Sequence, residues 1–241
     1  MKLTDFKVLT FDCYGTLIDW ETGMLEALAL LVKRVQPPPS NDQVLAAHGR
    51  HEHFQELWTP TRRYSDLLAT VWKRLAEEWG VPASWEEALA YGQSIGSWPA
   101  FSDTVEALAY LKRHYRLVVL SNVDNASFAK SNARLQVAFD AIYTAEDIGS
   151  YKPAPRNFEY MLEKLKTLGL EKKDVLHTAQ SLFHDHGPAK AIGLSSCWID
   201  RRHDRGGGFG ATVRPDAVPA YDFRFTSLAE MVKAHRKELE K

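Results

Sequence analysis

Five short apolar runs, rich in β-branched and aromatic residues, alternate with helical patterns and constrain the fold more than any other feature of this sequence. The runs occupy residues 7–12, 116–122, 140–147, 174–181 and 195–200. Runs of this kind are typical of strands that are buried on both faces of a sheet. The helical patterns between them lie at 104–114, 125–135, 158–168 and 188–193. The alternation predicts parallel strands joined by right-handed crossovers, and hence a doubly wound α/β fold.

Residues 20–98 break this alternation, because they are rich in helix formers and tryptophan and contain no convincing strand. We interpret them as a helical insertion that leaves after the first strand and lies above the strand ends as a cap. The predicted domains are a core of residues 1–18 and 99–241 and a helical cap of residues 19–98. The polar, glycine-rich segment 201–215 predicts a mobile surface loop.

The composition excludes a strong overall electrostatic field, since the chain has 30 basic and 31 acidic residues and a formal net charge of −1. We therefore expect no nucleic-acid partner and no anionic membrane surface as a partner. The chain has no signal-peptide pattern and no uninterrupted apolar stretch of about 18 residues, so we expect a cytoplasmic protein. Cys13 and Cys197 lie far apart without metal-ligand spacing, which predicts buried free thiols.

Polar residues follow four of the predicted strands, at the sheet edge where open parallel sheets bind ligands. They are Asp12 after the first strand, Ser121 and Asn122 after the second, Lys152 beyond the third and Asp185 beyond the fourth. Each one alone could be a turn cap, a loop start or a solvated side chain. Their joint placement at one edge favours a catalytic site.

The chemistry of these residue types suits nucleophilic catalysis. Asp12 stands at a strand end, and Gly15 permits the sharp turn that exposes its carboxylate in a fixed direction. The Lys152 charge would favour the ionised carboxylate. Ser121 and Asn122 supply hydrogen-bond donors for a substrate anion or a departing group.

The segments FDCYGTLID (11–19), SN (121–122) and YKP (151–153), with the acid at 185, resemble the four motifs of the haloacid dehalogenase superfamily. They occur in the same order as in the family and span almost the whole chain. The resemblance implies a hydrolase with a Rossmann-like core and a cap inserted after the first motif.

Two positions depart from the phosphate-transferring branch of that family, which resembles this chain less. That branch carries a second Asp where this chain has Tyr14, and an additional motif acid where this chain has Ser181. Magnesium prefers carboxylate and water oxygens, so the resemblance implies neither a metal nor another cofactor. A magnesium-dependent phosphatase and a non-catalytic interaction protein stay open as alternatives.

Tyr14 is what a resemblance to the (S)-2-haloacid dehalogenases implies. In that scheme Asp12 displaces the halide, and water then cleaves the aspartyl ester to release a 2-hydroxy acid. Lys152 stabilises Asp12, Thr16 donates a hydrogen bond to it, and Asp185 orders the water that cleaves the ester.

The same resemblance assigns the binding of a small carboxylic-acid substrate. Ser121 holds the substrate carboxylate, Asn122 cradles the departing halide, and Tyr14 lines the substrate site. A cap arginine also contacts substrate or halide in such enzymes, and we prefer Arg50 because it stands early in the insertion. The other candidates are Arg62 and Arg63. A homodimer formed through the cap stays open.

Other residues depart from the dehalogenase pattern. Phe158 replaces a tyrosine, Leu182 replaces an asparagine, and His184 and His186 flank Asp185. FDCYGTLIDWETG, SYKPAP and HTAQSLFHDH also resemble L-azetidine-2-carboxylate hydrolases, which open a strained ring by the same displacement. His184 would then be a general acid for the ring nitrogen. Equally, both histidines could cap or pair with loop carbonyls.

Overall fold

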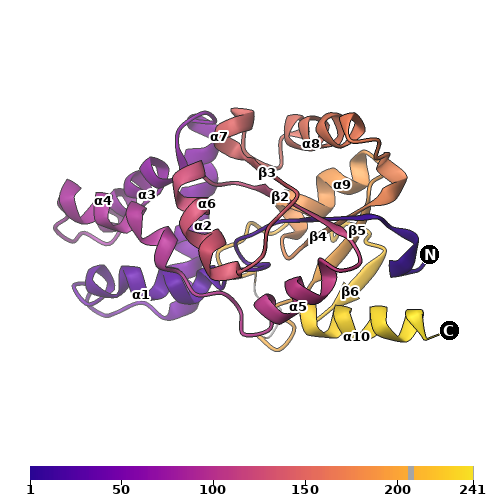
Figure 1. Cartoon of the computed structure of the whole chain (residues 1–241). Coiled ribbons are helices and arrows are strands. Elements are labelled where there is room, and N and C mark those ends of the chain that lie inside the picture. The colour runs from indigo at the N-terminus through magenta and orange to yellow at the C-terminus, as the bar shows by residue number, and fades with distance from the viewer. Residues whose placement is uncertain (206–208, 241) are drawn as a thin grey trace.

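A computed structural model describes residues 1–205 and 209–240 of the chain. Six parallel strands form one sheet in the order β3-β2-β1-β4-β5-β6 (Figure 1). The strands are β1 (Val8–Phe11), β2 (Arg116–Ser121), β3 (Ala141–Thr144), β4 (Val175–Ala179), β5 (Ser195–Ile199) and β6 (Phe223–Phe225). The predicted α/β fold and its five strands are confirmed. The strand order reverses at β1 and β4, which places the ligand-binding edge of such a sheet at their carboxyl ends.

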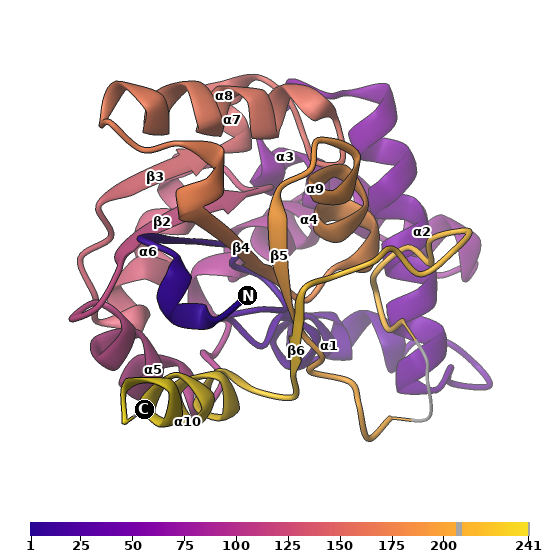
Figure 2. The ribbon, with the colours of Figure 1, turned by 90° about the vertical axis from the view of Figure 1, so that its right-hand side faces the viewer.

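Helices cover both faces of this sheet (Figure 2). Leu9 and Phe11 of β1 belong to the larger buried cluster, which includes residues of α5, α6 and α10. Val8 points to the opposite face, as alternation along a strand requires, and lies in a second cluster with residues of α8 and α9. The helices are α5 (Thr104–Leu111), α6 (Asn125–Leu135), α7 (Ala145–Ile148), α8 (Pro155–Thr167), α9 (Gly187–Ala191) and α10 (Leu228–Leu239). The third predicted run was too long, because its last residues form α7.

Helix α8 fixes the loop that carries the motif lysine. It begins with Pro155, whose fixed φ suits the first helical position, only three residues after Lys152. Phe158, Met161 and Leu165 recur at spacings of three and four residues and are buried against the sheet. The anchored helix therefore holds the lysine close to the ends of β1 and β2.

The segment between β1 and α5 is helical throughout its regular structure and lies at the left of Figure 1. Its helices are α1 (Trp20–Val32), α2 (Asn41–Trp58), α3 (Tyr64–Glu78) and α4 (Trp85–Gln93). Short 3₁₀ turns lie at Leu3–Asp5, Ser94–Ser97 and Lys172–Asp174, and a π-helical turn lies at Leu182–His186. The division into a core and a cap of residues 19–98 stays a prediction.

The segment 201–215 differs from the surface loop that its composition predicts. Residues 206–208 lie outside the described part, whereas Arg202, Ala211 and Thr212 are buried. Arg202 forms an ion pair with Glu21 of α1, so this buried part of the segment packs against the helical insertion, whereas residues 203–205 are exposed.

Two simpler expectations can be compared directly with the structure. Cys13 and Cys197 are both buried and free, as predicted. Within residues 1–205 and 209–240, no helix has the length and apolar character needed to cross a membrane.

Candidate active site

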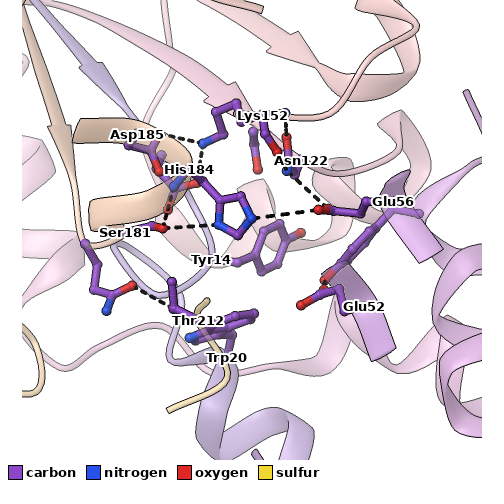
Figure 3. Close-up of a pocket in the computed structure, with 14 residues that line it drawn as sticks. Tyr14, Trp20, Glu52, Glu56, Asn122, Lys152, Ser181, His184, Asp185 and Thr212 are labelled. Atoms are coloured by element: carbon purple, nitrogen blue, oxygen red, sulfur yellow. Dashed lines mark hydrogen bonds and ion pairs between the residues drawn. The ribbon is translucent and has the colours of Figure 1, made fainter. Parts of the chain in front are cut away.

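A small cavity lies where the carboxyl ends of the central strands meet the helical insertion (Figure 3). Its free volume of about 40 Å³ suits a few waters or a small substrate. The lining residues are Asp12, Tyr14, Trp20, Glu52, Glu56, Tyr64, Ser121, Asn122, Lys152, Gln180, Ser181, His184, Asp185 and Thr212. The structure thus brings all the predicted strand-end residues together.

Asp12 is held at the end of β1 by hydrogen bonds to both carboxylate oxygens. Thr16 Oγ1 donates to Oδ2 at 2.8 Å, and Lys152 Nζ donates to Oδ1 at 2.8 Å. The turn between Asp12 and Thr16 passes through Gly15 at φ +93°, a conformation that glycine adopts without strain. Burial raises the pKa of the Asp12 carboxyl, and the Lys152 charge opposes that rise.

Lys152 bridges two carboxylates in the interior. Its ammonium group donates to Asp12 Oδ1 and Asp185 Oδ1, each at 2.8 Å, and to the Leu120 carbonyl at 3.0 Å. Burial alone would lower the pKa of Lys152, but the charges of the two carboxylates outweigh it and raise that pKa. The lysine is therefore a permanent cation that serves both acids.

Asp185 is held by a residue that the sequence analysis missed. His177 of β4 and Asp185 Oδ1 are hydrogen-bonded through the histidine Nε2 at 2.8 Å, and Thr10 Oγ1 lies 2.8 Å from His177 Nδ1. Burial would raise the pKa of Asp185, but Lys152 and His177 hold it well below its usual range. Asp185 Oδ2 is buried without a hydrogen-bond partner in the described structure. That oxygen is an unused hydrogen-bond acceptor of a residue that lines the cavity.

Asn122 links the lysine loop to the insertion. Its Oδ1 accepts from the Lys152 backbone N–H at 2.7 Å, and its Nδ2 donates to the Lys152 carbonyl and to Glu56 Oε1. Both amide protons are thus engaged, which corrects the expectation that Asn122 is free to cradle a halide. Ser121 Oγ, in contrast, is buried without a partner among the described residues and can donate to a ligand.

The two histidines beside Asp185 have different positions. His184 lies beside the cavity with its Nδ1 3.1 Å from Ser181 Oγ, whereas His186 lies between Ser196 Oγ and the Ala179 carbonyl at 3.0 Å each. Burial lowers the pKa of each histidine to about 4. This lowering favours the neutral form of both histidines near pH 7, so burial argues against His184 as a general acid there.

The structure also contradicts the choice of Arg50. Its guanidinium group is about half exposed and donates to both oxygens of Glu78 at 2.7 Å, outside the cavity. Arg62 and Arg63 are likewise absent from the lining residues. Helix α2 instead places Glu52 and Glu56 against the cavity, both buried.

Glu52 and Glu56 are two buried carboxyl groups close enough to affect each other's pKa. Tyr64 Oη donates a hydrogen bond to Glu52 Oε1, yet burial raises the pKa of Glu52 to about 7. Burial, followed by the charge of Glu52, raises the pKa of Glu56 well above its usual range. The pair therefore holds a proton at neutral pH.

Glu52→Gln is expected to stabilise the protein in alkaline but not in acidic solution. The folded-state pKa of Glu52 is about 7 against an ordinary 4.5, so the wild type loses up to about 3 kcal/mol of stability as the pH rises through that window. Glutamine avoids this loss and can still accept the Tyr64 hydrogen bond. Urea unfolding at pH 4.5 and pH 8 measures the difference, with exposed Glu77→Gln as control. Equal stabilisation at both pH values would contradict the assignment.

His177→Phe is expected to lower the unfolding free energy by about 1–3 kcal/mol, since it leaves the buried Thr10 hydroxyl and Asp185 Oδ1 each without one partner. The phenyl ring preserves the packing against Phe158, whose centroid lies 5.2 Å from that of His177. We also expect kcat to fall about tenfold as Asp185 loses its orientation. Urea unfolding and steady-state kinetics test both effects. A variant as stable as the wild type would show that these contacts are dispensable.

The donor set does not fit magnesium. An ammonium group, rather than a gap for a cation, lies between the two carboxylates at 2.8 Å from each. In the described ranges, no group of three or more histidine, cysteine, aspartate or glutamate side chains is arranged to hold a metal ion.

Known proteins with similar sequences are haloacid dehalogenase-type hydrolases. Residues 6–178 match the family model described as haloacid dehalogenase-like hydrolase. An (S)-2-haloacid dehalogenase of Pseudomonas fluorescens is 31% identical over 134 residues, which are 54% of this chain and 54% of the relative. (S)-2-haloacid dehalogenase 4A of Burkholderia cepacia is 21% identical over 209 residues, 81% of this chain and 84% of the relative. The first match thus spans about half the length of the curated relative.

The fold has close structural neighbours. The L-2-haloacid dehalogenase of Xanthobacter autotrophicus aligns with a TM-score of 0.77 and 19% identity, over 96% of this chain and 98% of that one. This likeness concerns the fold alone. Since the family model covers more than half of the sequence, the chain belongs to the haloacid dehalogenase-like hydrolases.

Proposed function

We propose that this protein is a metal-independent hydrolase that forms an ester between Asp12 and a carbon of a small 2-substituted carboxylic acid. The main support is a buried arrangement in which Lys152 Nζ lies 2.8 Å from Asp12 Oδ1 and 2.8 Å from Asp185 Oδ1. A fixed cation beside a carboxylate keeps it available as a nucleophile, and a second carboxylate can serve the water that follows. Dehalogenase relatives support this type of reaction.

In the first half-reaction an Asp12 oxygen attacks C2 of the substrate from the side opposite the leaving group. The new C–O bond forms as the bond to the leaving group breaks, and that group departs with the bonding electrons. The unpartnered Ser121 Oγ would donate to the substrate carboxylate. Lys152 and Thr16 would hold the attacking carboxylate in line during the displacement.

In the second half-reaction water attacks the carbonyl carbon of the Asp12 ester. The free Asp185 Oδ2 would accept a hydrogen bond from this water and orient it. The ester then breaks between the Asp12 carbonyl carbon and the substrate oxygen. The product is a 2-hydroxy acid, and Asp12 is restored as a carboxylate with one oxygen from water.

A halide is the leaving group that the dehalogenase relatives suggest, and a ring amine is the second candidate. The charge of the cavity favours the second, because four carboxyl groups and one ammonium group line it and no arginine does. A 2-haloacid brings only negative charge to this wall. L-azetidine-2-carboxylate also brings a basic nitrogen, which can accept a proton from a carboxyl group of this wall.

Incubation of the purified protein with (S)-2-chloropropionate, fluoroacetate and L-azetidine-2-carboxylate tests the proposal. Halide release and the 2-hydroxy acid product are followed in parallel, with and without a metal chelator. Turnover of at least one substrate, insensitive to chelator, is the expected result. Turnover of none would refute the substrate class, and chelator-sensitive cleavage of a phosphate ester would support the phosphatase alternative.

A further inference from the structure

Glu56 occupies the part of the cavity that the sequence assigned to the leaving group. Its Oε1 accepts a hydrogen bond from Asn122 Nδ2 at 3.1 Å, so the amide expected to hold a departing halide holds a carboxyl group (Figure 3). Its Oε2 lies 3.8 Å from His184 Nε2, which is beyond hydrogen-bond distance. His184 Nε2 is itself buried without a hydrogen-bond partner among the described residues. The second oxygen of Glu56 therefore remains available to a ligand.

Glu52 lies one helical turn before Glu56 on the same wall. Side chains four residues apart share a face of a helix, and both of these acids line the cavity. The one ammonium group of the lining, that of Lys152, already binds Asp12 and Asp185. Two buried carboxyl groups without a cation of their own are most stable when they retain a proton.

A protonated carboxyl group is of little use to a halide but of great use to a basic leaving group. A halide departs as a stable anion and requires no proton. A nitrogen that leaves with the bonding electrons is a very strong base, and protonation during bond breaking removes most of that barrier. An acid at the leaving-group position therefore discriminates between these two substrate classes.

We propose that Glu56 is a catalytic acid that protonates a basic nitrogen leaving group as Asp12 attacks the adjoining carbon, and that Glu52 keeps the proton on the pair. The inference rests on the proposed aspartyl-ester mechanism and specifies its leaving group. Asn122 orients Glu56 by binding the oxygen that does not carry the transferred proton.

The proposed step conserves atoms and charge. The substrate reacts with its ring nitrogen as the neutral amine. The Asp12 carboxylate forms a C–O bond, the C–N bond breaks with its electron pair on nitrogen, and the Glu56 proton moves to that nitrogen. Asp12 becomes a neutral ester while Glu56 becomes a carboxylate, so the net charge is unchanged. Hydrolysis of the ester then restores the Asp12 carboxylate and releases one proton, which returns to Glu56.

Glu56→Gln tests the acid separately from its structural contact, because a glutamine oxygen can still accept from Asn122. We measure wild type and variant with L-azetidine-2-carboxylate, as the nitrogen substrate, and with (S)-2-chloropropionate. Ring opening is expected to fall by about 10²-fold or more, and by at least about thirtyfold more than chloride release. Parallel losses, or no loss, would overturn the proposed acid. Wild-type turnover of chloropropionate alone would overturn it too, while leaving the ester mechanism intact.

An infrared difference spectrum between wild type and Glu56→Gln at pH 7 needs no turnover. A protonated-carboxyl carbonyl band that is present in the wild type and missing from the variant is expected. Absence of that band from both proteins would show that Glu56 is ionised and would overturn the proposal. If neither substrate reacts but the band is present, the proposed function fails while the proton on Glu56 is upheld.

Discussion

Asp12→Asn is expected to lower kcat by at least about 10⁴-fold, because an amide cannot supply the nucleophilic oxygen. The amide oxygen can still accept from Lys152, the amide nitrogen can donate to the Thr16 hydroxyl oxygen, and the substitution removes a buried negative charge rather than adding one. The fold should therefore survive, and loss of activity reports on chemistry. Arg50→Ala, which affects only the exposed ion pair with Glu78, is the matched control and should retain activity within about twofold.

The same residue should become covalently labelled during turnover. In heavy-oxygen water, a single turnover is expected to place the label in the Asp12 carboxylate, because water attacks the ester at the aspartyl carbon. The first product molecule then carries the original Asp12 oxygen. Peptide mass spectrometry locates the label. Label in the first product, with unlabelled protein, would refute the ester.

Asp185→Asn separates the two half-reactions. Asp12 remains able to attack, but the unpartnered Oδ2 that would orient the water is replaced. We expect the protein mass to increase by that of the substrate's alkyl group bound to Asp12 and the ester to persist, whereas Asp12→Asn should show no increase. An adduct in neither variant would contradict the division of roles between these two carboxylates.

The strand-end residues could be predicted because a general rule of parallel sheets places them. Asp12, Ser121 and Asn122 lie at or just after the ends of adjacent strands, and the carboxyl ends of those strands share one edge whatever the loops do. Asp185 and Lys152 are carried to the same edge by the segments after β4 and β3. The resemblance to a known family added the expected roles, but the geometry depends only on topology.

The contribution of α2 could not be predicted, because this helix buries acidic side chains and exposes apolar ones. Glu52 and Glu56 are buried, whereas Leu57 and Trp58 are largely exposed. Pattern analysis assumes that a helix buries its apolar face, so it assigns these acids to solvent. Arg50 was preferred only from its place early in the insertion, which does not say which face of the helix meets the cavity. The packing of α2 against the lysine loop decides which of its side chains are buried. Asn122 links the two elements, because it binds both Glu56 and the Lys152 backbone.

His177 was missed for a related reason. It stands inside a strand that is buried along its whole length, where a polar side chain gives no visible interruption of the apolar run. Its partners, Thr10 and Asp185, come from β1 and from the π-helical turn after β4. A histidine within a buried strand therefore signals a hydrogen-bonded role, but the sequence does not say with which residues.

Lys152→Met is expected to reduce the unfolding free energy at neutral pH by about 3–5 kcal/mol and to abolish turnover. Methionine has a similar length and keeps the aliphatic contacts, so the loss reports the charge. The variant leaves Asp12 and Asp185 close together in the interior without a counter-ion, which is the costly way to break a buried ion pair. Turnover fails because burial then raises the pKa of the nucleophile without opposition.

The pH dependence identifies the cause of this instability. In the wild type, the depressed pKa of Asp185 contributes stability that is present above about pH 4, the unfolded value, and is lost only as the pH falls towards the folded value. In the variant, both carboxyls bind protons more tightly when folded, so its stability should recover as the pH falls from 8 to 4.5. Urea unfolding measures this, with exposed Lys173→Met as control. Lys152→Met combined with Asp185→Asn should regain stability at pH 8 without regaining activity. Equal stability of wild type and Lys152→Met at pH 8 would mean that the lysine does not neutralise these acids.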